Sequence, residues 1–79
     1  MAIVTKVKWG RELTQSEIEQ INAYITAQIQ AGTTDGVSYI DGLDLDTVTV
    51  RFWTTSESAT SFIAFENSIG TPPVSAQVL

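Results

Sequence analysis

Several stretches of the chain alternate between apolar and polar residues, a period of two that is typical of β-strands with one buried side. The first stretch covers residues 3–9. Val7 and Trp9 share one of its faces, and Lys6 and Lys8 share the other. The pattern therefore predicts a strand whose Trp9 side packs into the core and whose lysine side stays outside it.

Three further strands are predicted in the rest of the chain. Residues 33–36 have the composition of a turn, and residues 37–40 form a short strand pattern after it. An acidic connection, residues 41–46, leads to an alternating stretch at 47–53. Because this connection is short, the two strands should pair as an antiparallel hairpin. Residues 74–79 alternate again and predict the last strand.

The two faces of the third predicted strand differ in apolar character. Val48, Val50 and Phe52 form the more apolar set, which predicts that this face packs against the helices. Arg51 and Trp53 then belong to the opposite face, on the same side as the two lysines of the first strand. Under this assignment, Phe52 is a core residue.

The first helix is predicted over residues 15–31. Thr14 and Glu17 have the spacing of a capping box, in which each side chain accepts a hydrogen bond from the other residue's backbone N–H. Gly32 supplies a helix stop. Isoleucines then recur at helical spacing and form one apolar stripe: Ile18, Ile21, Ile25 and Ile29.

The second helix is predicted between Thr54 and Gly70. Thr54 and Glu57 have the spacing of a second capping box, directly after the third strand. Gly70 and the following Pro72-Pro73 prevent the helix from continuing. Its apolar stripe contains Ala59, Phe62, Ile63 and Ile69, with Phe65 beside them.

The order of these elements predicts an α+β fold of the ferredoxin-like type, β-α-β-β-α-β, in a single domain spanning residues 1–79. Right-handed crossovers would place the first and third strands at the centre of a four-stranded antiparallel sheet, with both helices on one face. The other face of the sheet would need water, a ligand or a partner to cover it.

Composition narrows the classes of function. The 79 residues carry a formal charge of -5 and include neither Cys nor His. The negative charge argues against nucleic-acid binding, and no apolar run is long enough to span a membrane. The absence of Cys excludes disulfides and thiolate metal sites. The first residues form no signal-peptide block, so we expect a cytoplasmic protein. A chain this short buries a small core, which favours self-association, most simply as a dimer.

One segment joins a strand ending in an aromatic residue to a polar cap and an alanine-containing helix. It is Arg51-Phe52-Trp53-Thr54-Thr55-Ser56-Glu57-Ser58-Ala59, which leads on to Phe62. It resembles the dimeric α/β-barrel branch of the ferredoxin-like proteins, which includes antibiotic-biosynthesis-monooxygenase-like domains. The resemblance implies a dimer in which the open sheets of two protomers pack together. Some members are oxygenases or decarboxylating enzymes, and catalytic members often use histidine. This chain has none, which removes haem-ligand and imidazole-base chemistry.

The uncovered sheet face is the first candidate site. Four residues are predicted to lie together on this face: Lys6, Lys8, Arg51 and Trp53. Three of them are basic, out of four basic residues in the chain. One hypothesis is a site for a small anionic or aromatic ligand, with Trp53 as a stacking surface. The other is a sheet-to-sheet dimer interface, or lysine stems lying over Trp53. RNA-recognition domains share this topology, but the third strand lacks their aromatic and glycine signature.

A pocket between the helices and the sheet is the second candidate site. Trp9, Tyr24 and Tyr39 are the residues expected to line it, although an inward tyrosine is more often a core residue. Without His or Cys, the sequence offers no recognisable catalytic group, so no catalytic residue or cofactor is predicted.

The acidic connection contains Asp41, Asp44 and Asp46, residue types that bind calcium. Their spacing is not that of an EF-hand, and Leu43 and Leu45 interrupt it. A solvated turn is the simpler interpretation, and no metal site is predicted.

Three functions remain open at the level of sequence. The first is a non-catalytic homodimer formed through the sheet face. The second is a small-molecule-binding or cofactorless enzyme domain of the dimeric α/β-barrel type. The third is an adaptor or assembly subunit, as some accessory proteins of phages and marine microbes are.

Overall fold

The computed structural model describes residues 3–41, 48–70 and 72–79, and for residues 39–41 it describes the backbone alone. The chain has the α+β class predicted from the sequence, with two helices and one four-stranded antiparallel sheet. The strand order is β2-β3-β1-β4, so β1 and β3 are central. The elements are β1 (Ile3–Lys8), α1 (Gln15–Ala31), β2 (Thr34–Asp41), β3 (Val48–Trp53), α2 (Ser56–Ser68) and β4 (Ser75–Val78).

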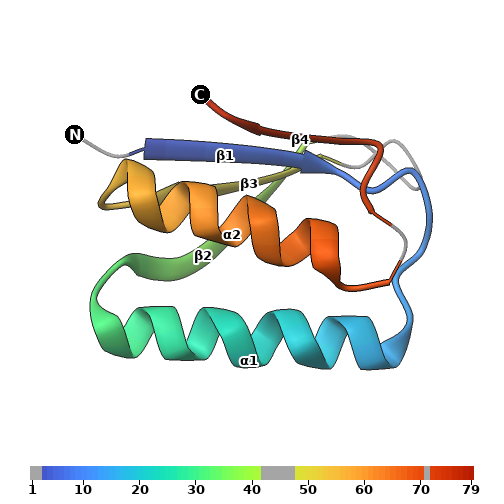
Figure 1. Ribbon diagram of the computed structural model, residues 1–79, viewed down its shortest axis with the longest axis horizontal. Helices are drawn as coiled ribbons and strands as arrows, with labels where there is room; N and C mark the ends of the chain where they lie inside the picture. Colours follow the sequence, from blue (N-terminus) through green and yellow to red (C-terminus); the bar gives the residue numbers. More distant parts are fainter. Residues whose placement is uncertain (1–2, 42–47, 71) are drawn as a thin grey trace.

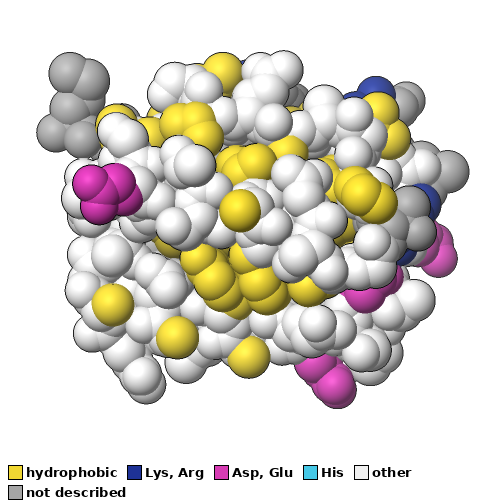
Figure 2. Space-filling view, in the orientation of Figure 1, with side chains coloured by type: hydrophobic (Ala, Val, Ile, Leu, Met, Phe, Trp, Pro, Cys, Tyr) yellow, Lys and Arg dark blue, Asp and Glu magenta, His cyan; other side chains and the backbone are white. Residues whose placement is uncertain are grey.

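Both helices run along the same face of the sheet (Figure 1). The core between them contains Ile21 and Ile25 from α1 and Phe62 from α2, together with Val7 and Trp53 from the sheet. Apolar side chains are visible along the seam between the helices (Figure 2). The core is thus a single layer between the sheet and the helix pair. Within the described part of the chain, neither helix combines the length and apolar character needed to cross a bilayer.

Helix α1 begins and ends where the sequence predicts. The backbone N–H of Glu17 donates to Thr14 Oγ1 at 3.2 Å, and the N–H of Thr14 donates to Glu17 Oε1 at 2.8 Å, which completes the capping box. At the other end, Gly32 adopts φ 78°, a left-handed conformation that glycine reaches without steric cost. The N–H of Thr33 donates to the carbonyl of Gln28, as in a Schellman motif.

Helix α2 begins one residue later than predicted. Its N-cap is Thr55, whose Oγ1 accepts from the N–H of Ser58 at 3.1 Å, so Thr54 and Glu57 do not form the expected capping box. The N–H of Thr54 instead donates to the carbonyl of Thr33 at 2.9 Å. This bond extends the pairing at the end of β3 by one residue, and the chain becomes free to turn into a helix only after it.

Strand β2 begins earlier than predicted, because the expected turn residues 33–36 are partly inside the strand. Thr34 pairs with Trp53, and the next registered pair is Ser38 with Arg51, so an irregularity separates them. Gly36 within this irregularity has φ 79°. The Thr34 hydroxyl donates to the carbonyl of Phe52 at 2.9 Å. The turn-like composition therefore marks a bulge in a strand.

The two faces of β3 are the reverse of the prediction. Thr5 of β1 pairs with Arg51, and Val7 pairs with Thr49, so Arg51 and Thr49 share the helix-covered face with the buried side of β1. Trp53 lies on the same face and is only 1% exposed. Since side chains alternate along a strand, the apolar set of β3 belongs to the opposite face.

We call this second side of the sheet the open face. Its residues on β1, β3 and β4 are Val4, Lys6, Lys8, Val48, Val50, Phe52, Ser75 and Gln77. The valines and Phe52 are half-buried, and Lys6 is exposed. Phe52 is therefore not the core residue that the alternation predicted, whereas Trp9 is buried as expected.

Candidate functional site

A cavity of about 160 Å³ opens between the sheet, the first half of α1 and the C-terminal end of α2. β3 supplies Thr49 and Arg51, and the segment after β1 supplies Trp9. The reversed faces of β3 are what bring Arg51 to this cavity. The complete lining is Trp9, Leu13, Ile18, Ile21, Asn22, Thr49, Arg51 and Glu66.

Two charged residues in this lining have buried atoms without partners. Glu66 is 3% exposed, and its Oε2 accepts and donates no hydrogen bond among the described residues. The same holds for Nε of Arg51, within the same part of the chain. Buried polar atoms are nearly always hydrogen-bonded in folded proteins. An acid and a guanidinium that line one cavity and each keep one buried atom without a partner in the described structure are therefore its most distinctive chemical feature.

Burial changes the protonation behaviour of both groups. Loss of hydration raises the pKa of Glu66 from 4.5 to about 7, and the positive charge of Arg51 opposes this rise. Burial likewise lowers the pKa of Arg51, while Glu66 opposes that change, and the guanidinium stays charged. Its Cζ lies 5.8 Å from the centre of the Phe62 ring, a cation–π distance. The cavity thus offers a fixed cation and an acid that exchanges its proton near neutral pH.

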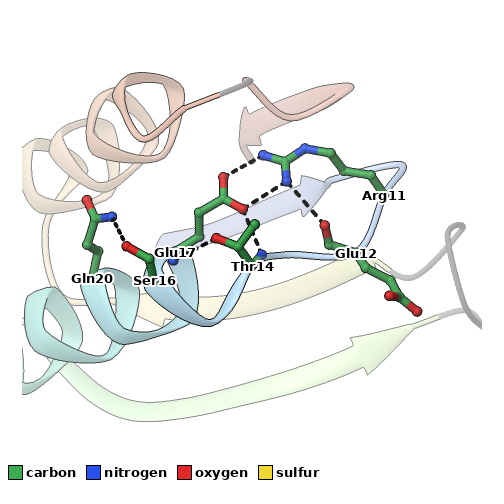
Figure 3. A network of polar contacts seen from close by, with 6 residues as sticks. All are labelled: Arg11, Glu12, Thr14, Ser16, Glu17 and Gln20. Atoms are coloured by element: carbon green, nitrogen blue, oxygen red, sulfur yellow. Dashed lines mark hydrogen bonds and ion pairs between the residues drawn. The ribbon is translucent and has the colours of Figure 1, made fainter.

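A polar network that includes Arg11, Thr14 and Glu17 lies at the start of α1 (Figure 3). It adjoins the Trp9 wall of the cavity through Arg11. The guanidinium of Arg11 lies 5.3 Å from the centre of the Trp9 ring and donates two hydrogen bonds to Glu17, at 2.7 and 2.9 Å. The bonds from Arg11 and from the backbone of Thr14 lower the pKa of Glu17 to about 2. The capping box that starts α1 therefore also holds the cation that covers Trp9.

The four residues predicted to form a site on the uncovered face do not lie together. Lys6 and Lys8 are on the open face, as predicted. Arg51 and Trp53 are on the helix-covered face, where Arg51 lines the cavity and Trp53 packs in the core. The predicted cluster was wrong because its two halves were assigned from separate strands. Only the register between the strands relates one face to the other.

The predicted pocket residues have different outcomes. Trp9 lines the cavity, as expected. Tyr24 instead stacks on Phe65 of α2, with ring centres 4.3 Å apart, and burial raises its pKa. The side chain of Tyr39 lies outside the described part of the structure, as do those of Asp41, Asp44 and Asp46. Among the described residues, no group of three or more acidic, histidine or cysteine side chains is placed to hold a metal ion.

Glu66 is not among the site residues predicted from the sequence, although its position carries a signal. Glu66 follows Phe62 by four residues, and Ile69, the C-cap of α2, follows Glu66 by three, so the buried stripe of α2 runs from Phe62 through Glu66 to the cap. A carboxylate within an apolar helical stripe is predicted to be buried, and a buried acid usually has a structural or functional role. Asn22 and Thr49 offer no such signal, because polar residues at exposed or half-exposed positions are ordinary.

A shallower hollow lies at the start of α2, lined by Ile3, Thr54, Thr55, Ser56 and Glu57. The last four of these side chains are exposed. Among the described residues, none that line this hollow has a buried polar side-chain atom without a partner. The cavity with Arg51 and Glu66 is therefore the stronger candidate.

Comparison with models of known protein families, with curated proteins and with solved structures gives no match to this chain. The resemblance to antibiotic-biosynthesis-monooxygenase-like domains accordingly stays a prediction from residues 51–62. The fold and the cavity are the basis for any statement about function.

Proposed function

We propose that this protein is a small-molecule-binding domain and that its ligand occupies the cavity between the helices and the sheet. The observation that carries the proposal is that Glu66 and Arg51 line one cavity, and that each keeps a buried polar atom, Oε2 and Nε, without a hydrogen-bond partner among the described residues. Leaving a buried polar group without a partner costs about 1–3 kcal/mol. A ligand with complementary polar atoms would recover that cost.

The size of the cavity limits the ligand. A dry cavity of about 150 Å³ accommodates benzene, and this one has a volume of about 160 Å³. Trp9, Leu13 and Ile21 provide apolar walls. The best-fitting ligands are therefore compact molecules with about one six-membered ring, held by apolar contact and oriented by the two polar groups.

The proposal is tested with benzamide, a neutral molecule of this size, titrated at millimolar concentration against ¹⁵N-labelled protein. We expect saturable chemical-shift changes at the cavity residues. Thr49→Phe would fill the cavity and abolish them. Val50→Phe adds the same ring to the opposite face of β3 and should leave binding intact. If neither benzamide nor its charged isosteres benzoate and benzamidine shift the cavity resonances, the proposal fails.

We also propose that the fold is ferredoxin-like. The alternation of elements along the chain and the central position of β1 and β3 support this assignment. Many unrelated functions use this architecture, so it supports a cavity between helices and sheet without selecting a reaction.

A second candidate function is pairing with a second copy of this chain through the open face. It is favoured by the half-buried apolar side chains of Val4, Val48, Val50 and Phe52, which form the centre of that face. In a symmetric dimer the same patch meets itself, so this apolar centre would be covered by its own equivalent. A small chain with a limited core gains most from such pairing.

Light scattering after size exclusion tests the pairing. We expect a dimer that Val50→Lys splits into monomers, because two charges would be brought into an apolar contact. Thr60→Lys places the same charge at an exposed position on α2 and should leave the dimer intact. A wild-type protein that stays monomeric at about 100 μM, a concentration at which a dimer with a micromolar Kd would be formed, contradicts the candidate. Trp53 is unsuitable for this test because it lies in the core.

A further inference from the structure

Arg51 supplies a fixed positive charge at the cavity. Its guanidinium lies over the Phe62 ring and is half-buried, so it is partly desolvated, and its Nε–H has no acceptor among the described residues. Guanidinium groups bind carboxylates with two parallel hydrogen bonds and favourable charge. The partner that Arg51 needs is therefore a hydrogen-bond acceptor, and a negatively charged acceptor fits the guanidinium best.

Glu66 of α2 lines the same cavity and also needs an oxygen acceptor when it is protonated. Burial in apolar surroundings favours its neutral form, which presents an O–H donor. With Glu66 neutral, both unpartnered groups are donors that need an oxygen acceptor. With Glu66 ionised, its negative charge would compete with an anionic ligand for Arg51.

We propose, on the basis of the binding function inferred above, that the ligand is a small monocarboxylate held between Arg51 and Glu66. One carboxylate oxygen accepts from the Arg51 guanidinium, and the other accepts from the Glu66 carboxyl. The compact apolar body of the ligand lies against Trp9, Leu13 and Ile21. No bond is formed or broken in this step; the carboxylate is bound with one proton retained on Glu66.

The other charged groups near the cavity do not replace either role. Arg11 and Glu17 form an ion pair at 2.7 Å at the start of α1, so their charges largely compensate each other. Tyr24 of α1 packs against Phe65 and is neutral, because its pKa is raised above 10. Thr5 and Val7 on the helix-covered side of β1 carry no charge, and neither does Trp9 after it. The residues of β4, Ser75–Val78, carry none either.

A cationic ligand fits the cavity less well. An ammonium or amidinium group could pair with ionised Glu66, but it would then lie beside the partly desolvated guanidinium of Arg51. A phosphate dianion would oppose Glu66 more strongly than a monocarboxylate does and would leave the walls formed by Leu13 and Ile21 without apolar contact.

Benzoate, benzamide and benzamidine provide an isosteric series with negative, neutral and positive charge. We expect benzoate to bind at least about tenfold more tightly than benzamide at pH 6, and benzamidine to bind most weakly. Because binding retains a proton on Glu66, benzoate affinity should fall by up to about tenfold per pH unit above pH 7. NMR titrations between pH 5.5 and 8.5 measure both effects, since benzoate stays ionised throughout.

Two variants separate the roles of the residues. Glu66→Gln keeps a donor at the same place without a titrating group, so it should bind benzoate with an affinity that is independent of pH in this range. Arg51→Met keeps most of the buried stem and should remove the preference for benzoate over benzamide. The charge series and Glu66→Gln decide the question even if Arg51→Met does not fold.

The outcomes distinguish this inference from the binding function beneath it. Equal binding of benzoate and benzamide, tighter binding of benzamidine, or the same pH dependence in Glu66→Gln would overturn the monocarboxylate while leaving a small-molecule cavity. No binding by any of the three molecules would overturn the binding function itself and leave a cavity filled by water.

Discussion

The indole Nε1 of Trp53 donates a hydrogen bond to Oγ1 of Thr5 across the two central strands, at 3.0 Å. Thr5 is fully buried and Trp53 is 1% exposed, so water does not replace this bond. The indole also packs on Phe62 of α2, with ring centres 4.8 Å apart. One side chain thus links β3 to β1 through a polar contact and to α2 through an apolar one.

This bond should appear as an energetic coupling between the two residues. Thr5→Val leaves the indole N–H buried without an acceptor and should destabilise the fold by about 1–3 kcal/mol. In Trp53→Phe, the same Thr5 substitution should cost much less, because the orphaned donor is already absent. A double-mutant cycle measured by urea unfolding gives the coupling directly. Strictly additive effects would show that the hydrogen bond contributes nothing.

The reversed faces of β3 predict opposite sensitivities for two phenylalanines. Phe62→Ala empties a fully buried site and should cost about 3–5 kcal/mol. Phe52→Ala removes a half-buried ring from the open face and should cost clearly less. Unfolding is measured at a concentration where light scattering shows monomers, because an interface contact would add to the Phe52 value. A larger loss for Phe52 than for Phe62 would contradict the register of β3.

Glu66 should make the protein less stable as pH rises. Its folded-state pKa of about 7 lies above the ordinary value of 4.5, so the native state binds the proton more tightly than the unfolded chain does. The resulting stabilisation is fully present below about pH 4.5 and is lost as pH rises through 7. Relative to wild type, Glu66→Gln should therefore gain on the order of 3 kcal/mol between pH 4 and pH 8.

That comparison is made by urea unfolding of wild type and Glu66→Gln across the pH range. The protein must be free of ligand. A stability difference between wild type and Glu66→Gln that does not change with pH would mean that Glu66 titrates normally, and hence that it is not buried in a low-dielectric site.

Glu17 should have the opposite pH dependence. Its pKa is lowered from 4.5 to about 2 by the bonds from Arg11 and Thr14, so its stabilising effect is present above pH 4.5 and is lost as pH falls towards 2. NMR titration of the side-chain carboxyl should give a midpoint near 2. Glu17→Gln should reduce the loss of stability between pH 4.5 and pH 2, while Glu19→Gln, at an exposed position, should not. A Glu17 midpoint near 4.5 would show that the Arg11 pair does not persist in solution.

Local signals predicted the helices well because their causes are local. The capping box of Thr14 and Glu17 and the stop at Gly32 involve residues within a few positions of each other, and both ends of α1 agree with them. The second capping box failed for a non-local reason: the hydrogen bond from Thr54 to Thr33 joins residues 21 positions apart. The same distant pairing placed Thr34 inside β2.

The candidate site was less accessible from sequence. Trp9 was identified because it ends an alternating strand, and Arg51 was named but assigned to the wrong face. Glu66 was overlooked, although it lies between Phe62 and Ile69 of the predicted apolar stripe, because only the apolar members of that stripe were considered.

Sequence alone determined the order of strands and helices, the ends of α1 and the buried side of β1. Each of these depends on a repeat or a cap within one element, where the spacing of residues is enough. Tertiary structure alone decided which side of β3 faces the helices. Both of its faces, Val48-Val50-Phe52 and Thr49-Arg51-Trp53, contain residues that the core can accept, so alternation cannot choose between them. The pairing of Thr5 with Arg51 makes that choice, and it carries Arg51 to Glu66 at the cavity.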